Sequence, residues 1–174
     1  QLGYYSIRVL KDDGSLWAAG GNWAGQLANG VSNNTKIPTL APMTDTSGAD
    51  MINVVSVETG GYNTFAQTAD GTLWASGYNP AGELGLGTTS NTNRFTEVII
   101  PSGHGFVTEY ANGENGFTVI LMEDNTLWGV GNGSNGAWGA GPSVTGVQTS
   151  FVETTQIQDA NGDLQDFKAY VEAR

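Results

Sequence analysis

One sequence segment occurs three times in this chain, and it restricts the possible folds more than any other feature. Each copy opens with a short polar turn followed by Leu-Trp, and the three tryptophans are Trp17, Trp74 and Trp128. Glycines follow each tryptophan at offsets of 3, 8 and 13 residues, and a large apolar residue follows at an offset of 10. The copies begin 57 and 54 residues apart. Self-similarity of this kind is typical of proteins built from stacked structural repeats.

The composition favours short strands over helices. The 174 residues include 26 glycines, and only 13% of the residues are charged; these are about twice and about half of the usual fractions. Asn, Thr, Ser and Gly must therefore cover much of the surface, and these residues are poor helix formers that favour turns. No long segment has apolar residues at helical spacing, so we predict no helix.

The order of turns and apolar segments predicts four short strands in each repeat. One strand precedes the Leu-Trp turn and a second carries the Leu-Trp pair, which together indicate a β-hairpin. A third run follows the glycine-rich segment, as at 95–100, and a fourth run closes the unit. The fourth runs are 53–57, 106–110 and 167–171. We therefore predict an all-β fold of β-propeller blades, each with four antiparallel strands, as a partial propeller or arc of about three repeats.

We predict a single domain, 1–174, that is made of repeats and contains no linker. The predicted units are repeat 1 at about 1–52, repeat 2 at about 53–105, repeat 3 at about 106–166, and a strand of a further or shared blade at 167–174. Closed propellers usually have about four to eight blades. We therefore hypothesise that the chain is part of a larger propeller, or that copies of it pair head to tail.

We predict structural roles for the residues that recur in register. The tryptophans are expected to pack the blades because they are large and apolar. Glycine permits positive φ and close backbone approach, so the glycines at offsets of 3 and 8 are expected to shape the loops. The predicted structural set is Trp17, Trp74, Trp128, Gly20, Gly77, Gly131, Gly25, Gly82 and Gly136.

The middle copy resembles the regulator of chromosome condensation repeat. The resemblance rests on 60–79, Gly-Gly-Tyr-Asn-Thr-Phe-Ala-Gln-Thr-Ala-Asp-Gly-Thr-Leu-Trp-Ala-Ser-Gly-Tyr-Asn, and on 82–87, Gly-Glu-Leu-Gly-Leu-Gly. About three such repeats cover nearly the whole chain. The first copy departs from the pattern at Ala28, and the third departs at Glu114, Asn115 and Gly133. The resemblance implies a β-propeller. It also implies an alternative function, that of a signalling propeller serving as a nucleotide-exchange or interaction factor for a small GTPase.

The charge and the apolar pattern exclude several classes of partner. The formal charge is −11, with 17 acidic and six basic residues. Phosphate backbones are bound by clusters of Lys and Arg, so we predict no nucleic-acid binding. The longest strongly apolar run, 119–122, is far too short to cross a bilayer, so we predict no membrane insertion. The chain has no cysteine, which excludes disulfides and thiolate metal sites.

None of the motifs that suggest chemistry is convincing. Gly131–Gly136 fits a dinucleotide-binding pattern, but no helix is predicted after it to receive a pyrophosphate. Residues 159–166 place oxygen ligands at alternate positions, as calcium loops do, but lack the glycine and glutamate of such loops at the required positions. Asp13, Asp70 and Asp124 recur in the hairpin turns, where Asp bonds its own backbone. His104 is expected to be an exposed turn residue.

These comparisons lead to a prediction of no catalytic residue, no metal site and no cofactor, and therefore of a protein that is not an enzyme. A glycan-cleaving enzyme would need two carboxylates at a defined separation, and the sequence pairs none of its acids in this way.

Two aromatic residues in the glycine-rich loops are candidates for partner binding. Trp23 and Tyr78 occupy neighbouring positions of the loop and differ between copies, and Asn22 and Asn79 lie next to them. Aromatic side chains on variable loops are plausible anchors for a protein or a glycan. The alternative is that the two rings pack locally over the next blade.

The main functional prediction is a non-enzymatic structural or binding module. Its acidity, its few Lys and Arg residues and its many Gly, Asn and Thr residues resemble exterior proteins of bacteria or of phage virions, such as tail or fibre proteins. We therefore predict an extracellular or virion-surface location. The predicted partner is protein, through self-assembly or neighbouring structural subunits, with a surface glycan as a further candidate.

Overall fold

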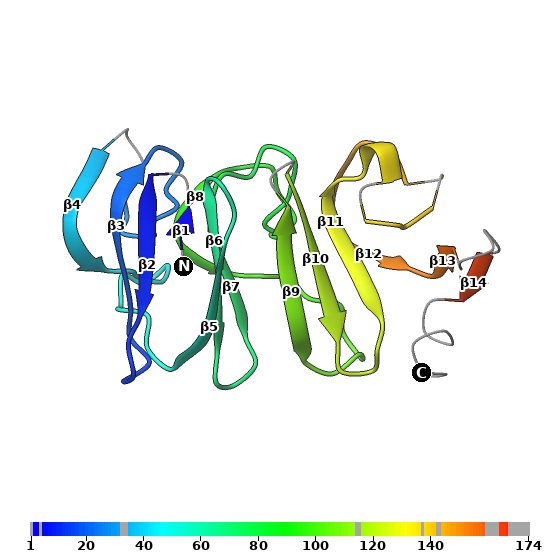
Figure 1. Ribbon diagram of the computed structural model, residues 1–174, viewed down its shortest axis with the longest axis horizontal. Helices are drawn as coiled ribbons and strands as arrows, with labels where there is room; N and C mark the ends of the chain where they lie inside the picture. The colour runs from blue at the N-terminus through cyan, green and yellow to red at the C-terminus, as the bar shows by residue number, and fades with distance from the viewer. Residues whose placement is uncertain are drawn as a thin grey trace.

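A computed structural model describes residues 2–3, 5–31, 35–113, 116–136, 138–141, 144–158 and 164–166. Over these residues the chain forms three four-stranded antiparallel sheets that stand side by side along its long axis (Figure 1). Neighbouring strands in each sheet are consecutive in sequence, so each sheet is a meander. The all-β prediction is confirmed, and each sheet corresponds to one propeller blade. The only helical element in this part of the chain is a single 3₁₀ turn, η1 (Ser134–Gly136).

The strands have the following bounds. Blade 1 contains β1 (Leu2–Gly3), β2 (Ser6–Leu10), β3 (Leu16–Asn22) and β4 (Thr35–Pro42). Blade 2 contains β5 (Val54–Thr59), β6 (Asn63–Thr68), β7 (Leu73–Gly77) and β8 (Thr92–Glu97). Blade 3 contains β9 (Val107–Gly113), β10 (Phe117–Met122), β11 (Leu127–Asn132) and β12 (Val147–Thr154). A separate two-stranded sheet follows, with β13 (Gln156–Gln158) and β14 (Leu164–Asp166).

The sequence pattern predicted that the runs at 53–57 and 106–110 close a unit, although the predicted repeat bounds already place them at the start of the next unit. They form β5 and β9, which open the next sheet instead of closing the preceding one, because each pairs with the strand that follows it. The pairing of Thr59 with Thr64 shows that a short connection joins β5 to β6. The run at 167–171 lies outside the described residues.

The glycine three residues after each repeat tryptophan lies at a register shift in the sheet. Pairing of the third strand with the fourth strand is interrupted just before Gly20, Gly77 and Gly131, whose φ angles are 110°, 117° and 101°. A Cβ at any of these positions would lie 2.3 Å from a backbone carbonyl oxygen of the preceding hairpin. The carbonyl belongs to Tyr5 in blade 1 and to Tyr62 in blade 2. Only glycine fits this contact.

The hydrophobic core lies between the blades. One buried cluster joins blades 1 and 2 and another joins blades 2 and 3. The largest fully buried side chains in these clusters are Phe65, Phe95, Leu16, Leu27, Met43, Leu73, Leu84, Ile120 and Met122. The three repeat tryptophans are only half-buried. Trp74 and Trp128 pack against the edges of the clusters, while Trp17 lies under the ammonium group of Lys11, 3.7 Å from the ring centroid.

Blades 2 and 3 each donate hydrogen bonds to the glycine-rich loop of the blade before them. Thr64 Oγ1 in blade 2 donates to the carbonyl of Gln26 in blade 1 at 2.8 Å, and Thr118 Oγ1 in blade 3 donates to the carbonyl of Glu83 in blade 2 at 2.7 Å. Ser76 Oγ adds a bond of 2.8 Å to the loop of blade 1. The glycine-rich loops of blades 1 and 2 are therefore fixed by the next sheet along the chain.

Candidate functional site

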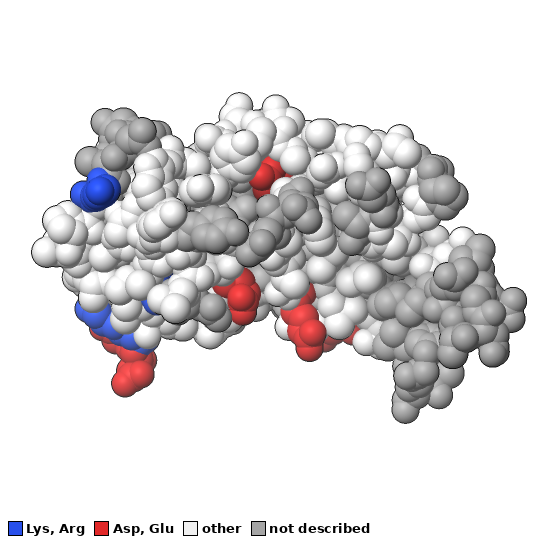
Figure 2. Space-filling view, turned by 45° about the horizontal axis from the view of Figure 1, so that its top comes forward, with Lys and Arg blue, Asp and Glu red and all other residues white. Residues whose placement is uncertain are grey.

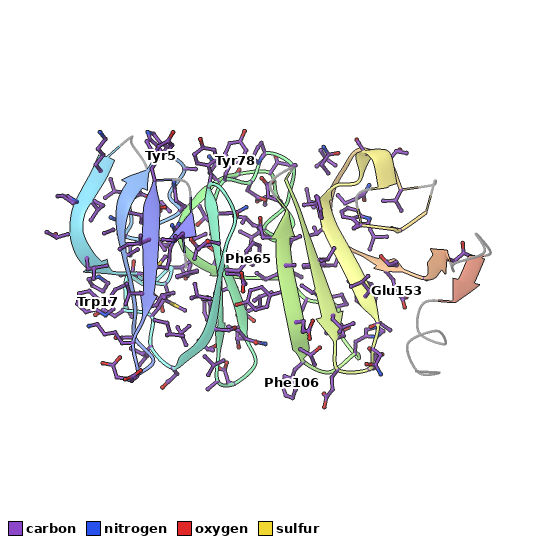
Figure 3. All side chains as sticks on the ribbon, in the orientation of Figure 1. Tyr5, Trp17, Phe65, Tyr78, Phe106 and Glu153 are labelled. Carbon is purple, nitrogen blue, oxygen red and sulfur yellow. The ribbon has the colours of Figure 1, made fainter. Side chains whose placement is uncertain are left out.

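Four aromatic side chains lie next to one another where the glycine-rich loops of blades 1 and 2 meet the hairpins. We call Tyr5, Trp23, Tyr62 and Tyr78 the aromatic row. Successive ring centroids are 5.3 Å, 6.2 Å and 6.2 Å apart, and the first two contacts are edge-to-face. Tyr5 and Tyr78 are 79% and 45% exposed. Figure 3 places both at the same end of the blades, opposite to Phe106.

The repeat places these rings together by pairing a hairpin with a loop in each blade. Tyr5 and Tyr62 occupy the same repeat position, just before the second strand of the blade. In blade 2 the carbonyl of Tyr62 accepts a hydrogen bond from the backbone N–H of Tyr78 at 3.0 Å. Blade 3 has Gly116 and Asn132 at the two matching positions, so the row is confined to blades 1 and 2.

A pocket of about 470 Å³ lies beside the row and is lined by residues of all three blades. Its wall includes Trp23, Tyr62 and Tyr78 of the row. The polar part of its lining includes Glu83 and the amides of Asn63 and Asn112. Concave sites with apolar walls and a few placed polar groups are the usual form of ligand-binding sites in proteins.

The two aromatic residues predicted from the loops, Trp23 and Tyr78, both line this pocket. Trp23 also packs locally, since its ring covers Gly21 so closely that a Cβ there would lie 2.4 Å from a ring atom. Local packing and exposure to the pocket therefore coexist at Trp23. The roles of both residues in binding stay predictions. Sequence reasoning missed Tyr5 and Tyr62, although a tyrosine at the same position of two repeats was the signal that identifies them.

Asn22 and Asn79, which were also predicted to take part in binding, lie inside the glycine-rich loops. Both residues are fully buried, and their side chains hold the glycine-rich loop in shape. Asn79 Oδ1 accepts a hydrogen bond from the N–H of Leu84 at 2.8 Å, and its Nδ2 donates to the carbonyls of Thr88 and Ser90. Asn22 makes the equivalent bond to the N–H of Leu27 at 3.0 Å. These asparagines support the loop, and their role in binding stays a prediction.

Replacing Asn79 with alanine should destabilise blade 2. The change removes three hydrogen bonds and takes the partner from the buried N–H of Leu84 and from two loop carbonyls, so we expect a loss of about 2–3 kcal/mol in the free energy of unfolding. Urea unfolding of the variant and the wild-type protein measures this loss in the free energy of unfolding. Thr89→Ala is a suitable control because Thr89 is exposed in the same loop and is not one of the partners of Asn79. Equal stability of Asn79→Ala and the wild-type protein would contradict the structural role.

Glu83 is the charged residue of the pocket, although it is only 1% exposed. Its Oε2 accepts a hydrogen bond from the N–H of Ala81 at 2.9 Å. Burial raises the pKa of the Glu83 carboxyl, and backbone hydrogen bonds partly offset this rise. In blade 1 the same position is Gln26, whose Oε1 accepts the equivalent bond from the N–H of Ala24 at 2.9 Å. The loop therefore needs an acceptor here but not a negative charge.

The raised pKa of Glu83 predicts how its burial affects stability with pH. The folded state binds this proton more tightly than the unfolded chain does, so burial of the charge costs stability above the raised pKa. That cost disappears as the pH falls through the raised pKa toward the ordinary value of 4.5. We expect the wild-type protein to gain stability relative to Glu83→Gln between about pH 7 and about pH 4.5. Urea unfolding at both pH values tests this, and a constant difference between the two proteins would contradict it.

The repeated aspartates lie in the hairpin turns. Asp70 Oδ1 accepts hydrogen bonds from Thr68 Oγ1 at 2.7 Å and from the N–H of Thr72 at 3.0 Å. These bonds, that of Thr68 first, hold the pKa of Asp70 below its ordinary value. The carboxylates of Asp13 and Asp124 accept equivalent bonds from their own turns.

His104 is more enclosed than an exposed turn residue would be. Its Nδ1 lies 2.9 Å from Asp124 Oδ2, and its ring meets Trp128 edge-on with centroids 4.9 Å apart. The side chain is 28% exposed. The turns of blade 3 hold the histidine against its neighbours because the short connection after β8 folds back onto the hairpin of β10 and β11.

The remaining sequence motifs do not form a site in the described part of the chain. Only the one-turn η1 occurs within the glycine pattern at 131–136. Of the calcium-like segment at 159–166, residues 159–163 lie outside the described residues. Among the described residues, no group of three or more His, Cys, Asp or Glu side chains could hold a metal ion. No helix in the same part of the chain is long and apolar enough to cross a membrane.

Comparison with known proteins gives related sequences but no matching family model. The ultraviolet-B receptor UVR8 of Arabidopsis thaliana is 27% identical over 150 residues, which are 86% of this chain and 32% of the relative. The X-linked retinitis pigmentosa GTPase regulator homolog of Caenorhabditis elegans is 29% identical over 141 residues, 81% of this chain and 10% of the relative. Protein RCC2 of Homo sapiens is 29% identical over 123 residues, 71% of this chain and 22% of the relative. The chain thus spans about a third or less of these relatives.

Solved structures share the fold. Human WBSCR16 superposes with a TM-score of 0.71 at 23% identity, over 87% of this chain and 37% of that structure. Yeast RCC1 (Prp20), in a structure with Kap60 bound, gives a TM-score of 0.65 at 19% identity, over 95% of this chain and 35% of that one. Prp20p from Saccharomyces cerevisiae gives a TM-score of 0.66 at 21% identity, over 92% of this chain and 35% of that structure. Together with the threefold sequence repeat and the four-stranded blades, these relationships show that the chain is similar in sequence and in fold to RCC1-type β-propeller repeat proteins.

Proposed function

We propose that this chain is a protein-binding part of a signalling propeller and that it binds its partner through the end of the blades that carries the aromatic row. The observation that carries this proposal is the row itself. Its four rings are in contact with one another, and its tyrosine side chains are partly exposed to solvent. Aromatic residues are enriched at the centres of protein interfaces. Loops fixed on a rigid scaffold are a common location for such surfaces.

The partner class with the best support is a small GTPase. One relative is named a GTPase regulator homolog, and a structural neighbour, Prp20p, was described with its binding properties to Gsp1p and histones. The same yeast protein was solved with Kap60 bound. The chain covers only part of these proteins, so a partner of this class is proposed for it by similarity.

The structural role in a virion or at a cell exterior has no support from these relatives, which are named as a receptor, a GTPase regulator homolog and an RCC-type protein. The location and the glycan partner rested on composition alone and stay predictions. The proposal of protein binding does not depend on either of them.

The direct test is binding of the purified chain to a panel of small GTPases, each loaded with GDP, loaded with a GTP analogue, or free of nucleotide. Biolayer interferometry gives the dissociation constants, and release of fluorescent GDP shows whether binding promotes exchange. We expect one GTPase to bind, and we expect the double variant Tyr62→Ala/Tyr78→Ala to bind at least tenfold more weakly. Phe106→Ala is the matched control, since this exposed aromatic residue lies at the opposite end (Figure 3).

Two results would overturn parts of the proposal. Failure of every GTPase to bind would remove this partner class. Binding that is unchanged in the double variant, or equally weakened in Phe106→Ala, would show that the aromatic row is not the contact surface.

A further inference from the structure

We infer that the pocket beside the aromatic row binds a cationic side chain, the lysine or arginine of a partner protein, with Glu83 as its counter-ion. This inference rests on the proposed function, because it specifies which chemical group of the partner enters the surface. It is carried by three features of the described residues: the walls of the pocket, the charge of Glu83 and two buried amide oxygens.

The walls of the pocket suit a long side chain that ends in a cation. Trp23, Tyr62 and Tyr78 line one side, and Pro80 adds apolar surface next to them. The methylene stem of lysine or arginine can pack along such a wall. A cation is also attracted to aromatic faces within about 6 Å of the ring centroid, most strongly to tryptophan. A volume of about 470 Å³ has room for one side chain and part of its backbone.

Glu83 supplies a charge that the fold does not use. Its hydrogen bond to the N–H of Ala81 is reproduced in blade 1 by the neutral Gln26, so an amide would serve the loop equally well. Burial of the carboxylate costs free energy, and a cation in the pocket would recover part of that cost by favouring the charged form. The fold thus keeps an acid in a place where a neutral group would suffice.

Two amide oxygens of the pocket lining need hydrogen-bond donors. Asn63 Oδ1 and Asn112 Oδ1 are buried and have no hydrogen-bond partner among the described residues. Asn63 itself is only 5% exposed. The two oxygens converge on Gly60, where an added Cβ would lie 2.2 Å from the first and 2.3 Å from the second. Lysine and arginine carry several N–H donors and no acceptor, so their head groups suit acceptors that lack a donor, as these two oxygens do.

The charge distribution is consistent with a cationic ligand. None of the described basic residues lines the pocket. Arg8 is buried between blades 1 and 2, where its Nε donates to Thr64 Oγ1 and its Nη2 donates to the carbonyl of Gln26. Figure 2 shows a small acidic patch and no basic surface at the middle of the loop end, which is turned toward the viewer. A net charge of −11 further raises the local concentration of cations.

The test compares short peptides that differ in one side chain. The probes are acetyl-Gly-Lys-Gly-amide and acetyl-Gly-Arg-Gly-amide, with norleucine and citrulline as the neutral replacements. Binding to the full chain is followed by NMR chemical-shift changes of the tryptophan indole N–H groups. We expect a basic peptide to bind at least fivefold more tightly than its neutral counterpart, and we expect Glu83→Gln to abolish this difference.

Glu97→Gln is the matched control for the charge. Glu97 is exposed on β8 and does not line the pocket, so the variant changes the net charge equally. Glu83→Gln should fold, because Gln26 occupies the same position in blade 1, and circular dichroism checks this. Equal binding of basic and neutral peptides, absence of binding by any peptide, or equal losses in Glu83→Gln and Glu97→Gln would each overturn the inference.

The outcomes separate this inference from the proposed function. If the GTPase binds and depends on Tyr62 and Tyr78 but not on Glu83, the proposed function stands and the cation site is wrong. If basic peptides bind in a Glu83-dependent way but no GTPase binds, the cation site stands and that partner class is wrong.

Discussion

Replacing Gly77 with alanine is expected to destabilise the protein by about 3–5 kcal/mol. Two costs act together at this position. The backbone has φ 117°, which costs a residue with a Cβ about 1–3 kcal/mol. The added Cβ would also lie 2.3 Å from the carbonyl oxygen of Tyr62, a backbone atom that cannot swing aside, and overpacking of this kind costs about 1–3 kcal/mol. Urea unfolding of the variant and the wild-type protein measures the sum.

Gly103→Ala separates the two costs. Gly103 also has a positive φ, 88°, but nothing lies within 4 Å of the place where its Cβ would be. The control should therefore lose only the backbone term, about 1–2 kcal/mol. Equal losses in Gly77→Ala and Gly103→Ala would show that the contact with Tyr62 is not what requires glycine. Gly20→Ala, which repeats the geometry in blade 1, should behave as Gly77→Ala does.

The second large effect is expected for Phe65→Ala, which should cost about 3–5 kcal/mol. Phe65 is fully buried in the cluster between blades 2 and 3, and its ring lies 6.3 Å from that of Tyr110 on β9 (Figure 3). Truncation removes apolar contacts and leaves a cavity between two sheets, each of which is made rigid by its own hydrogen bonds, so the site cannot fully collapse.

Phe106→Ala is the control for Phe65→Ala, because the same change is made at a side chain that is 59% exposed. We expect it to cost about 1 kcal/mol or less. Thermal unfolding followed by circular dichroism and by tryptophan fluorescence measures both variants. Equal losses in the two would show that packing between blades 2 and 3 contributes little to stability.

The blades could be predicted from the sequence because the information for them is local and is repeated. The turn at Asp70 is shaped by bonds to Thr68 and Thr72, all within five residues, so the spacing alone specifies it. Strand order within a meander follows from short connections. The prediction that 53–57 closes a unit failed because the local pattern does not specify strand pairing. Only the pairing of Thr59 with Thr64 shows to which sheet the strand belongs.

The pocket could not be predicted because it depends on contacts between distant segments. Asn79 looked like an exposed loop residue, yet it is buried because the carbonyls of Thr88 and Ser90 fold back over it. Glu83 matched the repeat pattern and gave no sign of lining a pocket. Its role emerges only when Asn63 and Asn112, from the hairpin of its own blade and from the next blade, are brought beside it.

The hydrogen bonds from each blade to the loop of its predecessor give the array a direction. The loop that contains Gln26 accepts a hydrogen bond from Thr64, and the loop that contains Glu83 accepts one from Thr118, so the loop of each of these two blades depends on the blade that follows it. In arrays whose units interact with their nearest neighbours, stability is approximately a sum of unit and interface contributions, so a defect in one unit also weakens its neighbour. Here it would spread backward: a defect in blade 3 would loosen the loop of blade 2, while the loop of blade 1 would be affected only through blade 2.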